Sequence, residues 1–189
     1  MKRIIAVVMA ALLMFAFAAC GEKTPEVEAL NPLDVLNTVW ASYGDAERFP
    51  AGGGDMLTEA TTSWEGPAAF GVTGDAVEAL GATLHFPTAS ASKITDAASL
   101  MHAMNANTFT CGVFKVANVD DMDALVTEIK TTIDGTQWMC GFPEKVIIAK
   151  TGDTIVSVVG NAELVDTFNT KLTTAYASTT VVINEAIVA

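Results

Sequence analysis

The sequence predicts an α+β domain, because helical and strand-like hydrophobic patterns alternate along its second half. Residues 119–134 and 161–176 carry apolar side chains at intervals of three and four, as amphipathic helices do. Residues 146–150 and 154–159 are rich in β-branched side chains and flank a Thr-Gly-Asp sequence, which predicts a hairpin. Helices and paired strands in one chain indicate a sheet covered by helices.

The N-terminus has the three parts of a signal peptide over residues 1–19. Lys2 and Arg3 come first, and an apolar run from Ile4 to Phe17 follows them. This run of about 14 residues is too short to cross a bilayer comfortably as a permanent helix. Small residues then lead to Cys20, so we expect the chain to be exported.

Residues 17–20, Phe-Ala-Ala-Cys, resemble the cleavage site of bacterial lipoproteins, although Leu is commoner at the place of Phe17. The resemblance implies that the sulfur of Cys20 receives a diacylglyceryl group and that Cys20 becomes the new N-terminus. Two or more acyl chains hold a soluble domain at a membrane for long times. We therefore expect a lipid anchor on the extracytoplasmic face of the cell membrane. The alternatives are a secreted protein cut after Ala18 or Ala19 and an uncleaved anchor.

The charge of the chain excludes nucleic acid as a partner. Once residues 1–19 are removed, eight Lys and Arg face 22 Asp and Glu, a net charge of −14. The cations are scattered singly, whereas phosphate backbones require clustered Lys and Arg. An anionic membrane surface repels such a domain as well, so we expect attachment to depend on the lipid at Cys20.

The predicted domain spans residues 31–189, after a flexible lipidated tether over residues 20–30. Asn31 and Pro32 form a helix start, and apolar residues at helical spacing predict a helix over 32–43. Glycine-rich turns follow, so residues 31–92 are expected to be this helix and a loop-rich arm, with one or two helical turns near residues 73–81. Large apolar residues are expected to anchor the arm to the core: Met56, Leu57, Trp64, Phe70 and Phe86.

Residues 94–104 are ambiguous when judged from propensity alone. They contain helix formers, whereas residues 109–116 alternate as a strand does. The region from about 94 to 176 resembles a family of uncharacterised lipoproteins of anaerobic Gram-positive bacteria, built around a domain with no assigned function. The resemblance is carried by residues 107–116, by the helix after them, and by residues 146–160 with the closing helix.

This family resemblance implies that residues 94–104 are a strand. The implied order is strand, strand, helix, strand, strand, helix, within a core over residues 93–189. We therefore expect a mainly antiparallel sheet whose two helices cover one face. Residues 179–184 are a candidate last strand.

Cys111 and Cys140 are the cysteines that follow Cys20, and they flank the helix predicted over 119–134. An exported protein often pairs two such cysteines in a disulfide, which would pin that helix against the sheet. The alternative is two separate buried thiols, because free Cys packs as a small hydrophobe. A redox-active pair is a third possibility, but no Cys-x-x-Cys motif is present.

A soft-metal site is conceivable because thioether, imidazole and thiolate groups suit ions such as Cu(I). The candidate ligands are His102, Met104, Cys111 and Cys140, with Met101 and Met139 near them in sequence. A strand at residues 94–104 would point Met101 away from His102 and Met104, so core packing is the alternative.

No motif in the sequence assembles a catalytic set or implies a cofactor. It has no Gly-x-Ser-x-Gly, and the glycines at 52–54 are not followed by Gly-Lys-Ser/Thr. The tryptophans at 40, 64 and 138 suit either a ligand groove or the core. We therefore expect a non-enzymatic domain that binds an extracytoplasmic ligand or partner protein. The alternative is a thiol-redox or soft-metal protein using Cys111, Cys140 and His102.

Overall fold

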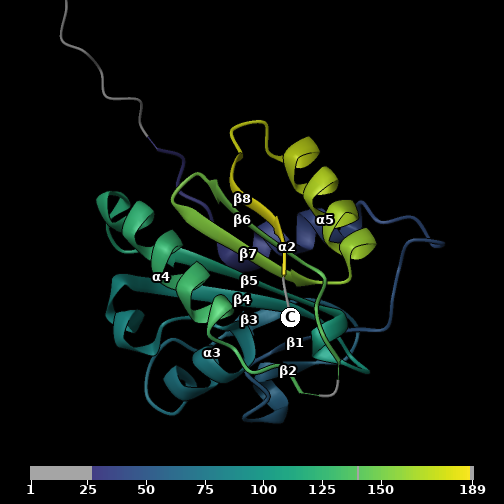
Figure 1. Cartoon of the computed structure of the whole chain (residues 1–189), viewed down its shortest axis with the longest axis horizontal. Coiled ribbons are helices and arrows are strands. Elements are labelled where there is room, and N and C mark those ends of the chain that lie inside the picture. Colours follow the sequence, from purple (N-terminus) through teal and green to yellow (C-terminus); the bar gives the residue numbers. More distant parts are fainter. Residues whose placement is uncertain (1–26, 140, 188–189) are drawn as a thin grey trace, which may run out of the picture.

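The computed structural model describes residues 27–139 and 141–187, which form an antiparallel sheet between two layers of helices (Figure 1). The strand order is β2-β1-β4-β5-β7-β6-β8, and β3 pairs with β4 beside β1. The strands are β1 (Ala51–Gly54), β2 (Thr62–Ser63), β3 (Ala68–Phe70), β4 (Ile94–His102), β5 (Phe109–Val116), β6 (Lys145–Thr151), β7 (Thr154–Gly160) and β8 (Thr180–Ala186). The helices are α2 (Pro32–Ala41), α3 (Ala76–Leu84), α4 (Met122–Asp134) and α5 (Ala162–Ala175). The α+β class is confirmed.

The order of elements over residues 94–176 is confirmed as strand, strand, helix, strand, strand, helix. Residues 94–102 are the strand β4 despite their helix formers. β4 pairs with β5 along one edge and with β1 and β3 along the other, and Ala97 and Ala98 are fully buried within the sheet. Backbone pairing on both edges thus overrides local propensity.

The expectation that both helices of this region cover one face of the sheet is wrong. Helix α5 packs with α2 on one face, over Leu100, Cys111 and Val158. Helix α4 packs with α3 on the other face, over Phe114 and Ile148. All seven residues of β7 are buried, and a strand with apolar side chains on both faces needs cover on both.

The predicted N-terminal helix is confirmed as α2. The side chain of Asn31 accepts hydrogen bonds from the backbone N–H groups of Leu33 (2.9 Å) and Asp34 (3.1 Å). Pro32 occupies the first helical position, and the helix ends at Ala41, two residues before the expected end. Its buried side, including Leu36 and Val39, joins the core shared with α5.

The arm that follows α2 extends the sheet instead of crossing its surface as a loop. It contributes the strands β1, β2 and β3 beside β4. It also contributes α3, which lies with α4 on the same face of the sheet. Phe70 and Phe86 are buried, as expected. The expectation for the other three anchors is wrong, because Met56, Leu57 and Trp64 are 41%, 51% and 68% exposed. β1 is Ala-Gly-Gly-Gly, so backbone packs on backbone there and the large side chains emerge outside.

The end of the predicted tether is fastened to the turn between β6 and β7. Leu30 N–H donates to Asp153 Oδ1 at 2.8 Å, and Asp153 N–H donates to the carbonyl of Glu28 at 2.9 Å. Lys115 Nζ donates to the carbonyl of Leu30 at 3.0 Å and lies 3.2 Å from Asp153 Oδ2. The chain therefore enters the domain at this end, as Figure 1 shows beside the β6–β7 hairpin.

Candidate functional site

Two of the residues singled out in the sequence, Cys20 and Cys140, lie outside the described residues, as does the signal peptide at 1–19. The lipid attachment and the Cys111–Cys140 pairing therefore stay predictions. Cys111 itself is fully buried in β5, in the core under α2 and α5. Burial raises the pKa of its thiol well above the ordinary value, which opposes formation of a reactive thiolate.

The candidate metal ligand His102, at the end of β4, is held in other contacts. The ring of His102 stacks on Phe49, with 5.6 Å between centroids and 13° between planes. Its Nδ1 atom accepts the backbone N–H of Met104 at 3.2 Å. Successive residues of a strand face opposite sides, so Met101 projects from the other face of the sheet. Among the described residues, no three His, Cys, Asp or Glu side chains form a group that can hold a metal ion.

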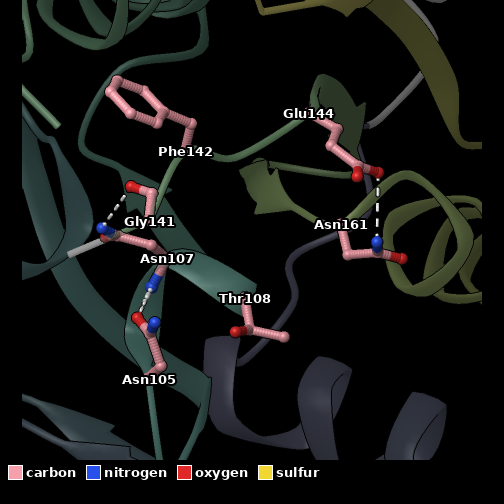
Figure 2. A pocket seen from close by; sticks show the side chains of 7 residues that line it. All are labelled: Asn105, Asn107, Thr108, Gly141, Phe142, Glu144 and Asn161. Carbon is pink, nitrogen blue, oxygen red and sulfur yellow. Dashed lines mark hydrogen bonds between the residues drawn. The ribbon is translucent and has the colours of Figure 1, made fainter. Parts of the chain in front are cut away.

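A polar cleft of about 160 Å³ opens at the end of the sheet where β5 and β6 begin and α5 starts (Figure 2). On one side, Asn107 Nδ2 donates to the carbonyls of Met139 (2.8 Å) and Gly141 (3.0 Å). On the other, Glu144 Oε2 accepts from Asn161 Nδ2 (3.1 Å) and from the backbone N–H of Ala162 (2.9 Å).

These contacts give the polar cleft a structural role. The Glu144 carboxylate lies at the N-terminus of α5, where it satisfies a free N–H and interacts favourably with the helix dipole. Asn107 holds the segment before β6 against the turn before β5. The hydrogen bonds drawn in Figure 2 thus fasten loops to one another, and the cleft between them is small.

A second hollow, which we call the apolar groove, is formed by Gly52, Met56, Trp64, Met101 and Met104, with Thr83 of α3 at its side. Its volume is about 280 Å³. Gly52 pairs across the strands with Met101, so both belong to one face of the sheet. A Cβ atom at Gly52 would lie 2.9 Å from the carbonyl oxygen of Ser63 and 3.9 Å from both Met56 Cε and Trp64 Cε3. The missing side chain of Gly52 therefore lets β2 approach β1 closely, and Met56 and Trp64 border this position.

The large apolar side chains at the rim of the apolar groove are unusually exposed. Trp64 is 68% exposed and Met104 is 80% exposed. Met56, at 41%, also has a φ of 60°, a left-handed conformation that non-glycine residues rarely adopt. Clusters of exposed apolar side chains are typical of interaction sites. A strained backbone conformation such as that of Met56 persists only where the surrounding structure imposes it.

The sequence predicted that Met56 and Trp64 anchor the arm to the core; Trp64 was also a candidate for a ligand groove, but nothing in the sequence placed the two residues together in one. The signal that pointed to it was the glycine run at 52–54, which leaves no side chains for large residues to pack against. Of the tryptophans left open between core and groove, Trp40 is in the core and 8% exposed. Trp138 packs edge-on against His85, with 4.8 Å between the ring centroids, whereas Trp64 lines the groove.

Comparison with known proteins finds no match: no family model, no curated protein and no solved structure is significantly similar to this chain. The resemblance to uncharacterised lipoproteins thus stays a prediction. In the part of the chain that the structure describes, no helix is both long and apolar enough to span a bilayer. The class defined on structural grounds is an antiparallel α+β domain with a helical layer on each face.

Proposed function

We propose that this protein is a lipid-anchored extracytoplasmic lipoprotein whose domain binds a ligand or partner without catalysing a reaction. The observation that carries the proposal is the apolar groove, where Met56, Trp64 and Met104 are held out to solvent around an open hollow. Apolar side chains exposed to water raise the free energy of the unbound protein. A partner that covers these side chains removes this cost.

The environments of the nucleophilic and titratable side chains favour binding over catalysis. Burial raises the pKa of the Cys111 thiol, and burial lowers the pKa of His85 to about 4, so neither titrates near neutral pH. His102 is engaged through its ring face and its Nδ1 atom. The redox and soft-metal alternative needs Cys111 and His102 accessible, so the packing of these two residues weighs against it.

The position of the tether supports the anchored arrangement. Residues 28–30 are fastened at the β6–β7 turn, and residues 20–26 can extend at most about 25 Å from there. β4 begins at that end and reaches the apolar groove nine residues later, a length of about 30 Å. An anchor at Cys20 would therefore join the domain at the end opposite the apolar groove.

Anchoring is tested with Cys20→Ser, and Cys140→Ser is the matched control. Cells are labelled with radioactive palmitate and separated into membrane and soluble fractions. Cys20→Ser should lose the label and should leave the membrane fraction or remain unprocessed, because its sulfur is the expected acylation site. Cys140→Ser should keep both the label and the membrane location. Normal processing and membrane retention of Cys20→Ser would contradict the proposal.

A further inference from the structure

We infer that the apolar groove binds a segment of a partner protein in which cationic residues flank a large apolar side chain. The inference rests on the proposed function, because it assigns a chemical class of occupant to the proposed binding surface. Shape, local charge and position in the molecule each support it.

The shape of the groove suits one large side chain. Its volume of about 280 Å³ is too small for a folded element but accommodates an aromatic or branched aliphatic group. Trp64 supplies a broad rigid surface, and the thioethers of Met56 and Met104 are flexible enough to adapt to different occupants. Such surfaces are typical of proteins that recognise apolar anchors in peptides.

Charge around the groove selects a cationic segment. Residues 56–65, which carry Met56 and Trp64, contain no Lys or Arg and two acids, Glu59 and Glu65. Glu59 and Glu65 are exposed, and Glu65 directly follows Trp64. A Lys or Arg beside the apolar anchor meets this negative potential and can also stack over the exposed indole.

The same observations disfavour a membrane surface as the occupant. Exposed Trp and Met side chains also insert into bilayers, but an anionic leaflet repels a surface segment with two exposed acids, Glu59 and Glu65, and no base. The groove also lies at the end of β4 remote from the fastened tether. A cationic protein segment that approaches from the side away from the membrane fits both the negative charge near the groove and its distance from the tether.

The test uses the mature chain, residues 20–189, carrying Cys20→Ser; it contains all described residues. Its binding to a fluorescent peptide of alternating Lys and Phe is measured by anisotropy. One control peptide replaces Lys with Glu, and another replaces Phe with Ser. We expect saturable binding of the Lys-Phe peptide, weakened by salt, and at least about tenfold weaker binding of both controls.

Site specificity is tested with matched surface variants. The double variant Trp64→Ser, Met104→Ser should weaken binding of the Lys-Phe peptide by about tenfold or more. The control Met139→Ser removes a methionine that is 78% exposed, close to the 80% of Met104, and should leave binding unchanged. Far-ultraviolet circular dichroism should be the same for all three proteins.

Three results would overturn the inference. The first is equal peptide binding by the double variant and by Met139→Ser, and the second is binding of the Glu-Phe peptide as strong as that of the Lys-Phe peptide. The third is flotation of the protein with anionic phosphatidylglycerol vesicles that the double variant loses, which would assign the groove to the membrane. None of these results depends on Cys20, so failure here is distinct from failure of the anchoring proposal.

Discussion

At the scale of single residues, His85 links the stability of the fold to pH. It follows α3 with a φ of 54°, packs edge-on against Trp138 and is partly buried. Desolvation lowers its pKa from 6.5 to about 4 in the folded protein. Between pH 6.5 and pH 4, His85 therefore binds a proton in the unfolded chain but stays neutral in the folded chain. The stabilisation from neutral His85 is complete above pH 6.5 and is lost as the pH falls toward 4.

Replacing His85 by Asn should flatten this pH dependence, because Asn tolerates the left-handed conformation and does not titrate. Wild-type protein should lose about 2 kcal/mol of unfolding free energy through this group between pH 6.5 and 4. The variant should be less stable at neutral pH, since it loses the contact with Trp138, but should lack this component of the pH slope. Urea unfolding at several pH values measures both. An unchanged slope in His85→Asn would contradict the assignment.

Residue-level prediction of the site from sequence succeeded only in part. The weak point was the assumption that a large apolar residue in a loop-rich segment packs inward, as Phe70 and Phe86 do. Met56 and Trp64 do not, because the glycines of β1 place backbone where a core would need side chains. Strand periodicity placed Met101 on the face opposite His102. The expectation that Met101 also points away from Met104 is wrong, because β4 ends at His102 and both methionines line the apolar groove.

At the scale of elements, β1 shows why part of the sheet was not predicted. A Cβ atom at Gly53 would lie 2.5 Å from both the backbone nitrogen of Ala68 and the carbonyl oxygen of Ser99. β1 and β3 share the edge of β4 through this close approach. A run of glycines carries no hydrophobic period, so sequence patterns predicted a turn where the structure has a strand.

Gly53→Ala should therefore detach the arm from the sheet edge. The new methyl group meets backbone atoms that cannot rotate away, and we expect a loss of about 3 kcal/mol in unfolding free energy. Gly135→Ala is the matched control, since its Cβ atom would have 3.4 Å to its nearest neighbour, the Thr131 carbonyl, and its φ is −84°. That change should stay within about 0.5 kcal/mol. Thermal unfolding compares the two, and equal melting temperatures would show that β1 tolerates a side chain.

The helices and hairpins of the core were predictable, but the layer to which each helix belongs was not. Periodicity defined α4 and α5, and the β-branched runs defined β6 and β7. The runs Val146 to Ala149 and Ile155 to Val156 lack polar alternation, which is the sign of a sheet buried on both faces. This pattern predicts helices on both faces of the sheet, and it would have placed α4 and α5 on opposite faces.

At the scale of the whole molecule, the contacts of residues 28–30 set the end at which the chain enters the domain, and we expect this end to lie nearer the membrane. Val27 and Ser178 line one hollow beside Gly152, at the end where the chain enters. Met104 lies beyond the far end of β4, about 30 Å along that strand. If Cys20 carries the lipid, Ser178 should face the membrane and Met104 should face away from it.

Fluorescence quenching tests this orientation in lipid vesicles. Single cysteines replace Ser178 or Met104 in lipidated protein that carries Cys140→Ser, since Cys111 is fully buried, and each is labelled with a fluorophore. Nitroxide groups on the lipid heads should quench the label at 178 strongly and the label at 104 weakly. Asp153→Ala removes the carboxylate that accepts Leu30 N–H and pairs with Lys115, so it should reduce this contrast. Equal quenching at both positions in the parent protein would mean that contacts at residues 28–30 do not orient the domain, and the groove would then be free to face the membrane.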